Sequence, residues 1–461
     1  MNSCDLRAAT DAAVEPIAEA GHCPPPRHLP ALDGLRALAV LLVLWDHAPG
    51  ALQPAWLSAL AKWRNPGNFG VDLFFVLSGF LITRILLAER KAGVPVRYFL
   101  ARRACRIFPI YYLLLAAIAL VRPTPELGWC ALYLSNLSSA LFVAPPSGLH
   151  HTWSLCVEEH FYALWPLLVS LLAPATSRRL IARVVVPGAL LAGALLVVLP
   201  AIGPLWRPLE SAVASGAIDR FDRLGLLLFG TPCRVLSLAI GSLFAYHEAA
   251  LVARWRRSVA VAALGMAAAA LLSTVTPQLC SVLHRAAGSA AGSVAGSAQL
   301  LPFPASDWKV LVGVGSTTLA SSSALLALLA LAGRDSKATR WLGFAPLTAI
   351  GRISYGLYLY HLPWLFAFDV HRRARAGETV TVALIFLALF AIATLSYLLI
   401  ERPILRFARR FREPPRERTR RSDPARGEPR GGERSGATVD AARRPGGRPS
   451  PIAHAATGDG G

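Results

Sequence analysis

Long uncharged apolar runs dominate the pattern of hydrophobic and polar positions along this chain of 461 residues. Four of them, 184–206, 258–283, 310–333 and 379–400, reach or exceed the ~20 residues that a helix needs to cross a hydrocarbon core of ~30 Å. Leu, Ala and Gly fill these runs and no long alternating pattern occurs, which disfavours a closed β-barrel. The pattern therefore predicts an all-α fold, a polytopic transmembrane helical bundle.

About ten membrane spans are predicted from these runs and from shorter apolar stretches between them. They are 35–55, 69–87, 107–122, 156–173, 183–203, 224–247, 258–276, 309–332, 345–368 and 378–400. A weaker apolar stretch at 127–144 is expected to be a re-entrant or outer-face segment rather than an eleventh span.

The basic loops set the expected orientation, because cytoplasmic loops of membrane proteins are rich in Lys and Arg. The loop at 89–106 is strongly basic and is predicted to be cytoplasmic, which places both termini there. With ten spans the basic loops at 178–183 and 254–257 also lie inside. The basic loop at 372–375 falls outside and disagrees with the rule.

Composition excludes an ordinary soluble globule, since 54% of the residues are hydrophobic, 16% are charged and the mean hydropathy is +0.47. The net charge is +20, and residues 402–461 alone hold fifteen arginines against seven acids. We expect a disordered cytoplasmic N-terminus at 1–28, a transmembrane domain at 29–410 and a disordered Arg/Pro/Gly-rich cytoplasmic tail at 411–461.

The first ~30 residues lack an apolar core, so a cleaved signal peptide is not expected. Seven cysteines without CxxC spacing suggest neither a zinc site nor a disulfide framework.

Arg36 and His47 are the first candidates for chemistry, because ionisable residues inside membrane segments are costly and usually functional. They are eleven residues apart, so on a helix they share one face and are separated by ~16 Å along the axis. An arginine at the cytoplasmic end suits an anionic phosphate, and a histidine deeper in the membrane suits proton transfer. A packing histidine is the competing interpretation for His47.

Two further segments with polar residues lie in the second span and at the start of the third. In the second span, Asp72 lies near the outer end and the small residues Ser78 and Gly79 favour close helix packing. The run 102–112 begins with a basic cluster whose simplest interpretation is anchoring on the cytoplasmic side.

The densest polar stretch is 150–166, where three histidines and the pair Glu158 and Glu159 surround an apolar segment. Negative charge at a helix start and an aromatic belt would explain part of it. A metal site from these histidines and carboxylates is a minor alternative, because no HExxH-like spacing is present. No metal and no tightly bound cofactor are expected.

Three later polar features complete the candidates. Arg234 opens one span, residues 351–364 contain Arg352, Tyr355, Tyr358 and His361, and the last span closes with Glu401 and Arg402. Glu401 and Arg402 are interpreted as a helix-end anchoring feature.

These residues fall in six blocks that resemble, in order, the acyltransferase-3 family of bacterial integral-membrane O-acyltransferases over roughly 29–410. The blocks are L-D-G-L-R-A-L-A-V with His eleven residues after Arg, G-V-D-L-F-F-V-L-S-G-F-L-I-T, R-R-x-x-R-I-x-P-x-Y, H-T-W-S-L-x-V-E-E-x-F-Y-x-L-W-P, R-I-S-Y-G-L-Y-L-x-H and S-Y-x-x-I-E-R-P. Two positions depart from the family pattern, Cys105 within the third block and His160 after the glutamate pair. The tail is too short and too biased in composition for the hydrolase-like domain that some members carry.

The resemblance implies transfer of an acyl group, commonly acetyl, from acyl-CoA to a hydroxyl of a carbohydrate or glycosylated acceptor at the cell membrane. It implies that His47 acts as general base or acyl carrier and that Glu158 and Glu159 orient or bind the acceptor. The arginines expected to hold the donor phosphates are Arg36, Arg102, Arg103 and Arg106. The residues expected to contact the acceptor or to be structural are Asp72, Trp153, Ser154, Arg234, Arg352, Tyr355 and His361. Polysaccharide, lipopolysaccharide, peptidoglycan and secondary-metabolite acceptors all fit, and O-acetylation of the cell envelope is the expected outcome.

Two competing functions are weighed against this one. A transporter or flippase for a lipid-linked sugar or acyl group would also place charges along a membrane pathway, although no internal repeat is found. A nucleic-acid binder is disfavoured, because Arg mixed with Glu, Pro and Gly in the tail indicates a solvated segment near anionic lipid.

Overall fold

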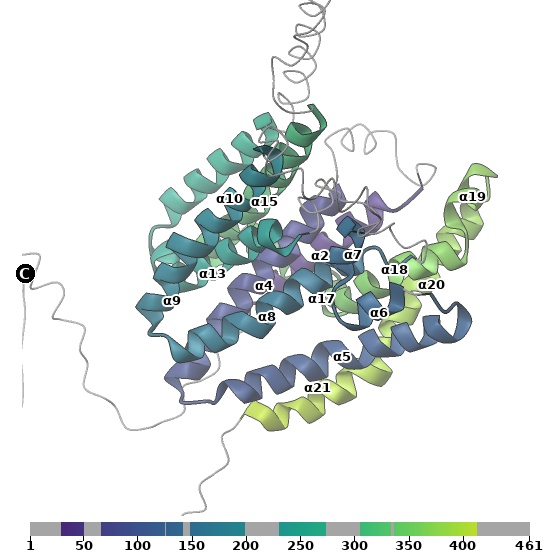
Figure 1. Ribbon diagram of the computed structural model, residues 1–461, viewed down its shortest axis with the longest axis horizontal. Coiled ribbons are helices and arrows are strands. Elements are labelled where there is room, and N and C mark those ends of the chain that lie inside the picture. Colours follow the sequence, from purple (N-terminus) through teal and green to yellow (C-terminus); the bar gives the residue numbers. More distant parts are fainter. Residues whose placement is uncertain are drawn as a thin grey trace, which may run out of the picture. The chain divides into compact units, whose positions relative to one another are not determined.

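The computed structural model describes residues 29–49, 66–124, 126–141, 148–198, 230–272, 305–332 and 336–412. All regular elements among these residues are helices, which confirms the all-α prediction (Figure 1). The predicted segment 1–28 lies outside the described residues, as does the predicted tail 411–461 apart from its first two residues, which belong to a helical turn.

The helices follow one another with short connections over most of the described chain. In the first half they are α2 (Pro30–Asp46), α4 (Pro66–Lys91), α5 (Val96–Val121), α6 (Glu126–Ala131), α7 (Ser135–Leu141), α8 (Thr152–Leu171), α9 (Pro174–Leu180), the π-helix η2 (Ile181–Val185) and α10 (Val186–Val198). In the second half they are α13 (Thr231–Ala253), Trp255–Leu272, α15 (Ala305–Ala332), α16 (Lys337–Leu342), α17 (Ala345–Arg352), α18 (Ser354–Ala367), α19 (Val370–Arg375), α20 (Thr379–Ser396), η4 (Tyr397–Glu401), α21 (Arg402–Ala408) and η5 (Arg409–Arg412). Proline stands in the first turn of α2, α9, α13, α17 and α21, where its missing N–H has no intrahelical partner to lose.

Six helices in the described part of the chain are long and apolar enough to cross a membrane. They are Pro66–Lys91, Val96–Val121, Thr231–Ala253, Trp255–Leu272, Val312–Ala332 and Thr379–Phe411. Each of the ten predicted spans overlaps a helix, but the count of ten is not confirmed. The predicted span 345–368, for example, is divided into α17 and α18 at Ile353.

The weak apolar stretch at 127–144 contains two short helices, α6 and α7, over the residues described there. Tyr133 separates them in a left-handed conformation, with φ of 55°. Six or seven helical residues extend only about 10 Å, which is too short to cross the hydrocarbon core. Neither helix is therefore a full span.

Helix α4 lies at the centre of the bundle and packs against α2, α8, α13 and α15 (Figure 1). Two glycines allow its backbone to touch that of α13. A Cβ atom on Gly79 would lie 1.9 Å from the Leu238 carbonyl oxygen, and one on Gly241 would lie 2.0 Å from the Val76 carbonyl oxygen. The packing role predicted for Gly79 is confirmed.

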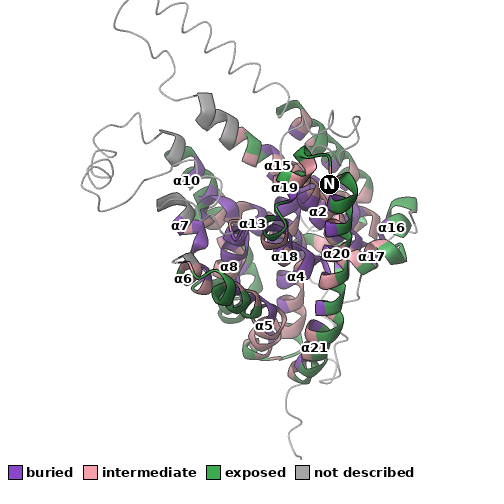
Figure 2. Ribbon diagram, turned by 90° about the vertical axis from the view of Figure 1, so that its right-hand side faces the viewer, coloured by how far each residue is buried: buried purple, intermediate pink, exposed green. Residues whose placement is uncertain are grey.

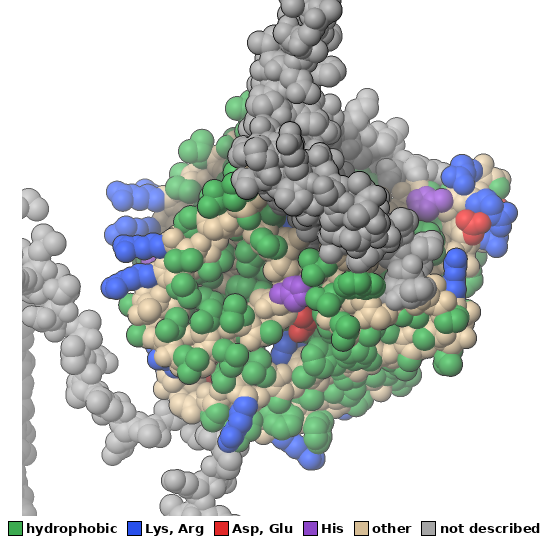
Figure 3. Space-filling view, viewed as in Figure 1, with side chains coloured by type: hydrophobic (Ala, Val, Ile, Leu, Met, Phe, Trp, Pro, Cys, Tyr) green, Lys and Arg blue, Asp and Glu red, His purple; other side chains and the backbone are tan. Residues whose placement is uncertain are grey.

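Buried residues are concentrated in α2, α4 and α8, and exposed residues lie on the outward faces of the surrounding helices (Figure 2). Many outward side chains are large and apolar, among them Leu120, Leu171 and Leu399. Figure 3 shows hydrophobic side chains across one face of the molecule and clusters of Lys and Arg toward its edges. An apolar surface of this extent suits contact with lipid.

Candidate active site

A partly open cavity of about 70 Å³ lies between α2, α4, α5, α8 and α18. Its lining combines arginines, a carboxylate and hydroxyl groups with apolar side chains. The lining residues are Arg36, Val71, Phe74, Phe75, Ser78, Arg103, Arg106, Ile107, Ser154, Leu155, Glu158, Ser354, Tyr355 and Tyr358. Five helices thus supply one cavity in which charged and polar groups stand among apolar side chains.

Three guanidinium groups, those of Arg36, Arg103 and Arg106, line this cavity together. Arg103 and Arg106 are one turn apart on α5, and Arg36 reaches the cavity from α2. Both α5 side chains repel Arg36 electrostatically. Such a cluster favours a ligand with several negative charges, because the ligand relieves the mutual repulsion.

Glu158 is the carboxylate of the cavity. Its Oε1 accepts a hydrogen bond of 2.7 Å from the Ser78 hydroxyl, and its Oε2 lies 3.8 Å from Arg103 Nη2. The Arg103 guanidinium carbon also lies 3.5 Å from the centre of the Tyr162 ring. Glu158 therefore joins α4, α5 and α8, while its neighbour Glu159 is not among the lining residues.

Arg102 lies outside the cavity lining, although it belongs to the same basic run. Its guanidinium pairs with Glu89 at the end of α4 and donates to the Phe411 carbonyl oxygen at 2.5 Å. These contacts tie α5 to the end of α4 and to η5. The structure thus separates Arg102 from the other three arginines of the predicted donor site.

The hydroxyl side of the cavity is a short hydrogen-bonded chain between α8 and α18. Ser154 Oγ lies 2.5 Å from the Tyr358 hydroxyl, and Tyr358 donates to the His151 carbonyl oxygen at 3.1 Å. Tyr355 donates to the Ile107 carbonyl oxygen at 3.2 Å. Of the residues predicted to contact an acceptor, Ser154 and Tyr355 therefore line the cavity.

His47 directly follows the last residue of α2, so one helix connects it to Arg36, as the eleven-residue spacing predicted. Its Nδ1 lies 2.9 Å from the Val43 carbonyl oxygen. Because a carbonyl oxygen only accepts, this contact places the proton of the neutral ring on Nδ1 and leaves Nε2 with a lone pair. Nε2 of His47 is thus the ring nitrogen that can accept a proton, although His47 is not one of the residues that line the cavity.

His361 lies beside His47, and His151 lies beside His361. The ring centres of His47 and His361 are 5.0 Å apart, and those of His361 and His151 are 4.9 Å apart. His361 is also 5.5 Å from the ring of Tyr358, which lines the cavity. The described residues contain no group of three His, Cys, Asp or Glu side chains arranged to hold a metal ion.

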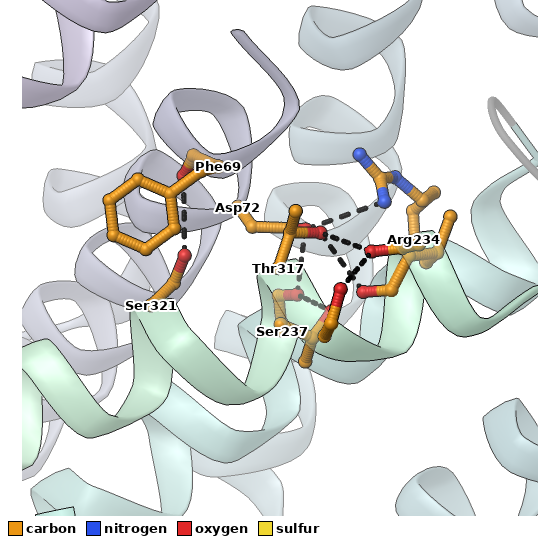
Figure 4. A network of polar contacts seen from close by, with 10 residues as sticks. Phe69, Asp72, Arg234, Ser237, Thr317 and Ser321 are labelled. Carbon is orange, nitrogen blue, oxygen red and sulfur yellow. Dashed lines mark hydrogen bonds and ion pairs between the residues drawn. The ribbon is translucent and has the colours of Figure 1, made fainter. Parts of the chain in front are cut away.

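Asp72 and Arg234 form a fully buried ion pair on the other side of α4, with 3.5 Å between Oδ1 and Nη1. Ser237 donates to Asp72 Oδ1 at 2.9 Å and Thr317 donates to Oδ2 at 2.5 Å, so α4, α13 and α15 meet at one carboxylate (Figure 4). The Arg234 guanidinium lies over the ring of Trp153, 5.1 Å from its centre. These residues support the wall of the cavity and do not line it.

Two other predicted polar residues lie away from the cavity. Arg352 is exposed at the end of α17. His160 contacts Thr231 Oγ1 at 2.7 Å and the Tyr133 carbonyl oxygen at 3.0 Å, and so fastens α8 to α13 and to the short helices.

Glu401 is a polar residue whose position the sequence interpretation missed. Its side chain is buried, near Gly356 on α18, and its charge attracts Arg106. Arg402, by contrast, is exposed. The sequence did contain a sign of this burial, because Glu401 directly follows the apolar residues 397–400. A carboxylate beside apolar residues on the same helical turn is a candidate for burial.

The chain is similar in sequence to known acyltransferases. A family model described as "Acyltransferase domain" matches residues 29–401. The chain is 26% identical over 406 residues to the peptidoglycan O-acetyltransferase OatA of Listeria monocytogenes, covering 82% of this chain and 56% of that protein. It is 28% identical over 404 residues to the O-acetyltransferase OatA of Staphylococcus aureus, covering 82% of this chain and 57% of that protein. A shorter match, 36% identity over 162 residues, covers 31% of this chain and 24% of the putative peptidoglycan O-acetyltransferase YrhL of Bacillus subtilis. The chain thus spans little more than half the length of the two OatA proteins, and no solved structure matches it.

Proposed function

The chain belongs to the acyltransferase-3 family, and on that premise we propose that it is a multi-pass membrane O-acetyltransferase that acts on a carbohydrate hydroxyl. The names of its relatives favour peptidoglycan as the acceptor. The apolar helices that carry the site fit a protein of the cell membrane. We include cytoplasmic termini in the proposal on the strength of the basic loop at 89–106.

One observation carries this proposal: the side chains of three arginines and one glutamate line a single cavity inside an otherwise apolar bundle. We assign to Arg36, Arg103 and Arg106 the binding of the phosphates of an acyl-CoA donor, because their guanidinium groups line the same cavity. Guanidinium groups bind phosphate oxygens with paired hydrogen bonds, and each charged hydrogen bond contributes about 1.5–3 kcal/mol.

Acetyl transfer to a hydroxyl also needs a base. We assign this role to His47, because the Val43 carbonyl oxygen fixes its tautomer and leaves Nε2 free to accept the acceptor's proton. Glu158 and the hydroxyls of Ser154 and Tyr358 would orient the acceptor or the acyl group in the cavity. Trp153, next to Ser154 on α8, supports that wall through its contact with Phe75.

The test is transfer of radiolabelled acetyl from acetyl-CoA to peptidoglycan fragments by the full chain in proteoliposomes, with free CoA measured in parallel. Wild-type protein is expected to release CoA only when acceptor is present and to leave an alkali-labile acetyl ester on the glycan. His47→Ala is expected to lose at least a hundredfold in rate, since general-base catalysis contributes ~10²–10⁴-fold.

His247→Ala serves as the matched control, because His247 is an exposed histidine on α13. A transporter or flippase would move its substrate and form no ester. Ester formation that persists in a correctly folded His47→Ala protein would remove His47 from the mechanism, and absence of any ester with all tested glycans would refute the proposed function.

A further inference from the structure

His361 is a buried imidazole to which the proposed reaction gives no role. Its side chain is fully buried in α18, and its Nδ1 lies 2.5 Å from the Tyr358 carbonyl oxygen. The carbonyl can only accept, so Nδ1 carries the proton and Nε2 keeps a lone pair. Among the described residues Nε2 has no hydrogen-bond partner. A buried acceptor without a partner is costly, which points to a partner present at one stage of the reaction only.

A group able to provide that partner is His47. The two ring centres are 5.0 Å apart and the rings are inclined at 68°. Two imidazoles joined by an N–H···N hydrogen bond of about 2.9 Å also have centres roughly 5 Å apart. The separation of the rings therefore matches that of a hydrogen-bonded pair, and the inclination of the rings would have to change for the two nitrogens to connect.

His151 holds the far side of His361 in place. Its ring centre is 4.9 Å from that of His361, and its Nε2 donates to the Leu359 carbonyl oxygen at 3.0 Å. Burial lowers the pKa of His151 to about 3 and the Leu359 contact opposes this shift only in part, so the ring is neutral at pH 7. A neutral His151 leaves His361 free to receive a hydrogen bond from a cation on its other side.

We propose that His361 is a positioning residue that accepts a hydrogen bond from the imidazolium of His47 during acyl transfer. This inference rests on the proposed function. The O–H bond of the acceptor breaks, its proton binds His47 Nε2, and the oxygen attacks the thioester carbon. The His47 N–H then donates to His361 Nε2 until the carbon–sulfur bond of the thioester breaks and the departing thiolate takes the proton. His361 itself touches neither substrate.

The test compares two replacements of His361 in the acetyl-transfer assay with full-length protein. His361→Leu is similar in size but cannot accept a hydrogen bond, whereas the amide oxygen of His361→Gln can. A hydrogen bond to a charged group corresponds to roughly tenfold to hundredfold in rate, so kcat of His361→Leu is expected to fall by that factor. The KM values for acetyl-CoA and for peptidoglycan fragments should stay within about twofold, because His361 does not contact either substrate, and His361→Gln should recover most of kcat.

Tyr360→Phe is the matched control on the same helix, because its hydroxyl bonds Ser396 at 2.7 Å and does not face the histidines. It should keep wild-type kcat, and melting temperatures in detergent should report whether each variant is folded. Wild-type kcat in His361→Leu, or equal losses in folded Leu and Gln variants, would overturn the inference. Wild-type protein and His47→Ala in the same assay separate this result from failure of the proposed function, which would appear as absence of ester with the wild-type protein.

Discussion

Asp72 and Arg234 are 162 positions apart in the chain, yet their side chains meet at 3.5 Å with no exposure to solvent. The carboxylate also accepts hydrogen bonds from Ser237 and Thr317, whereas the guanidinium nitrogens make no hydrogen bond to any described residue. The ion pair is therefore the main compensation for burying the Arg234 charge. It stands beside Trp153 and Phe75, behind the cavity wall.

Loss of one partner of this pair should be more harmful than loss of both. Asp72→Asn leaves the Arg234 cation buried without an opposite charge, which typically costs about 3–5 kcal/mol. We expect a clear fall in the melting temperature in detergent. The double variant Asp72→Asn, Arg234→Met should regain much of that loss, and equal melting temperatures for the wild type and Asp72→Asn would contradict the structural role.

The separation of Arg102 from the cavity leads to a second prediction. Arg106→Gln should raise the KM for acetyl-CoA by about tenfold or more, the equivalent of one lost charge-assisted contact. Arg102→Gln should instead lower the melting temperature, since Arg102 bonds Glu89 and the Phe411 carbonyl oxygen. Arg97→Gln, an exposed site at the start of α5, is the control. A larger KM effect from Arg102→Gln than from Arg106→Gln would place the donor phosphates elsewhere.

The basic run also illustrates what the sequence can and cannot predict. Spacing and apolar length were sufficient to predict the helices and the continuous helix between Arg36 and His47. They could not separate Arg102 from Arg103, because adjacent helical residues point about 100° apart and packing decides which of them faces inward. The contact between Ser78 and Glu158 likewise joins two helices whose pairing no local pattern specifies.

The same limit applies to Glu401 and to the number of spans. Glu401 follows an apolar run at the end of α20 and η4, and only the packing of α18 against this segment reveals that its carboxylate is buried. Hydropathy indicated ten apolar stretches as candidate membrane spans, but the helices within them differ in length from those stretches. One reason is that helix breaks, such as the one between α17 and α18 at Ile353, depend on tertiary packing.

Close packing of α4 on α13 gives a third prediction. Gly79→Ala would place a methyl group 1.9 Å from the Leu238 carbonyl oxygen. The methyl is attached directly to the backbone of α4 and the oxygen belongs to the backbone of α13, so the two helices would have to separate. We expect poor recovery of folded protein and a lower melting temperature. Gly313→Ala in α15 is the matched control, since no described residue outside the same helical turns lies within 4 Å of the added methyl and helix propensity favours alanine by roughly 0.5–1 kcal/mol. A Gly79→Ala protein as stable as Gly313→Ala would show that the two backbones are not in contact.

The two adjacent glutamates can be distinguished in the same way. Glu158 accepts a hydrogen bond from Ser78 and pairs with Arg103 in the cavity, whereas Glu159 lies outside its lining. Glu158→Gln keeps the shape of the side chain and removes the charge, so the contacts to Ser78 and Arg103 weaken together. Because hydrogen bonds to charged groups are worth about 1.5–3 kcal/mol, kcat/KM for the acceptor should fall roughly tenfold to hundredfold. Glu159→Gln should have a smaller effect on this ratio, and the reverse order would assign the acceptor to the other face of α8.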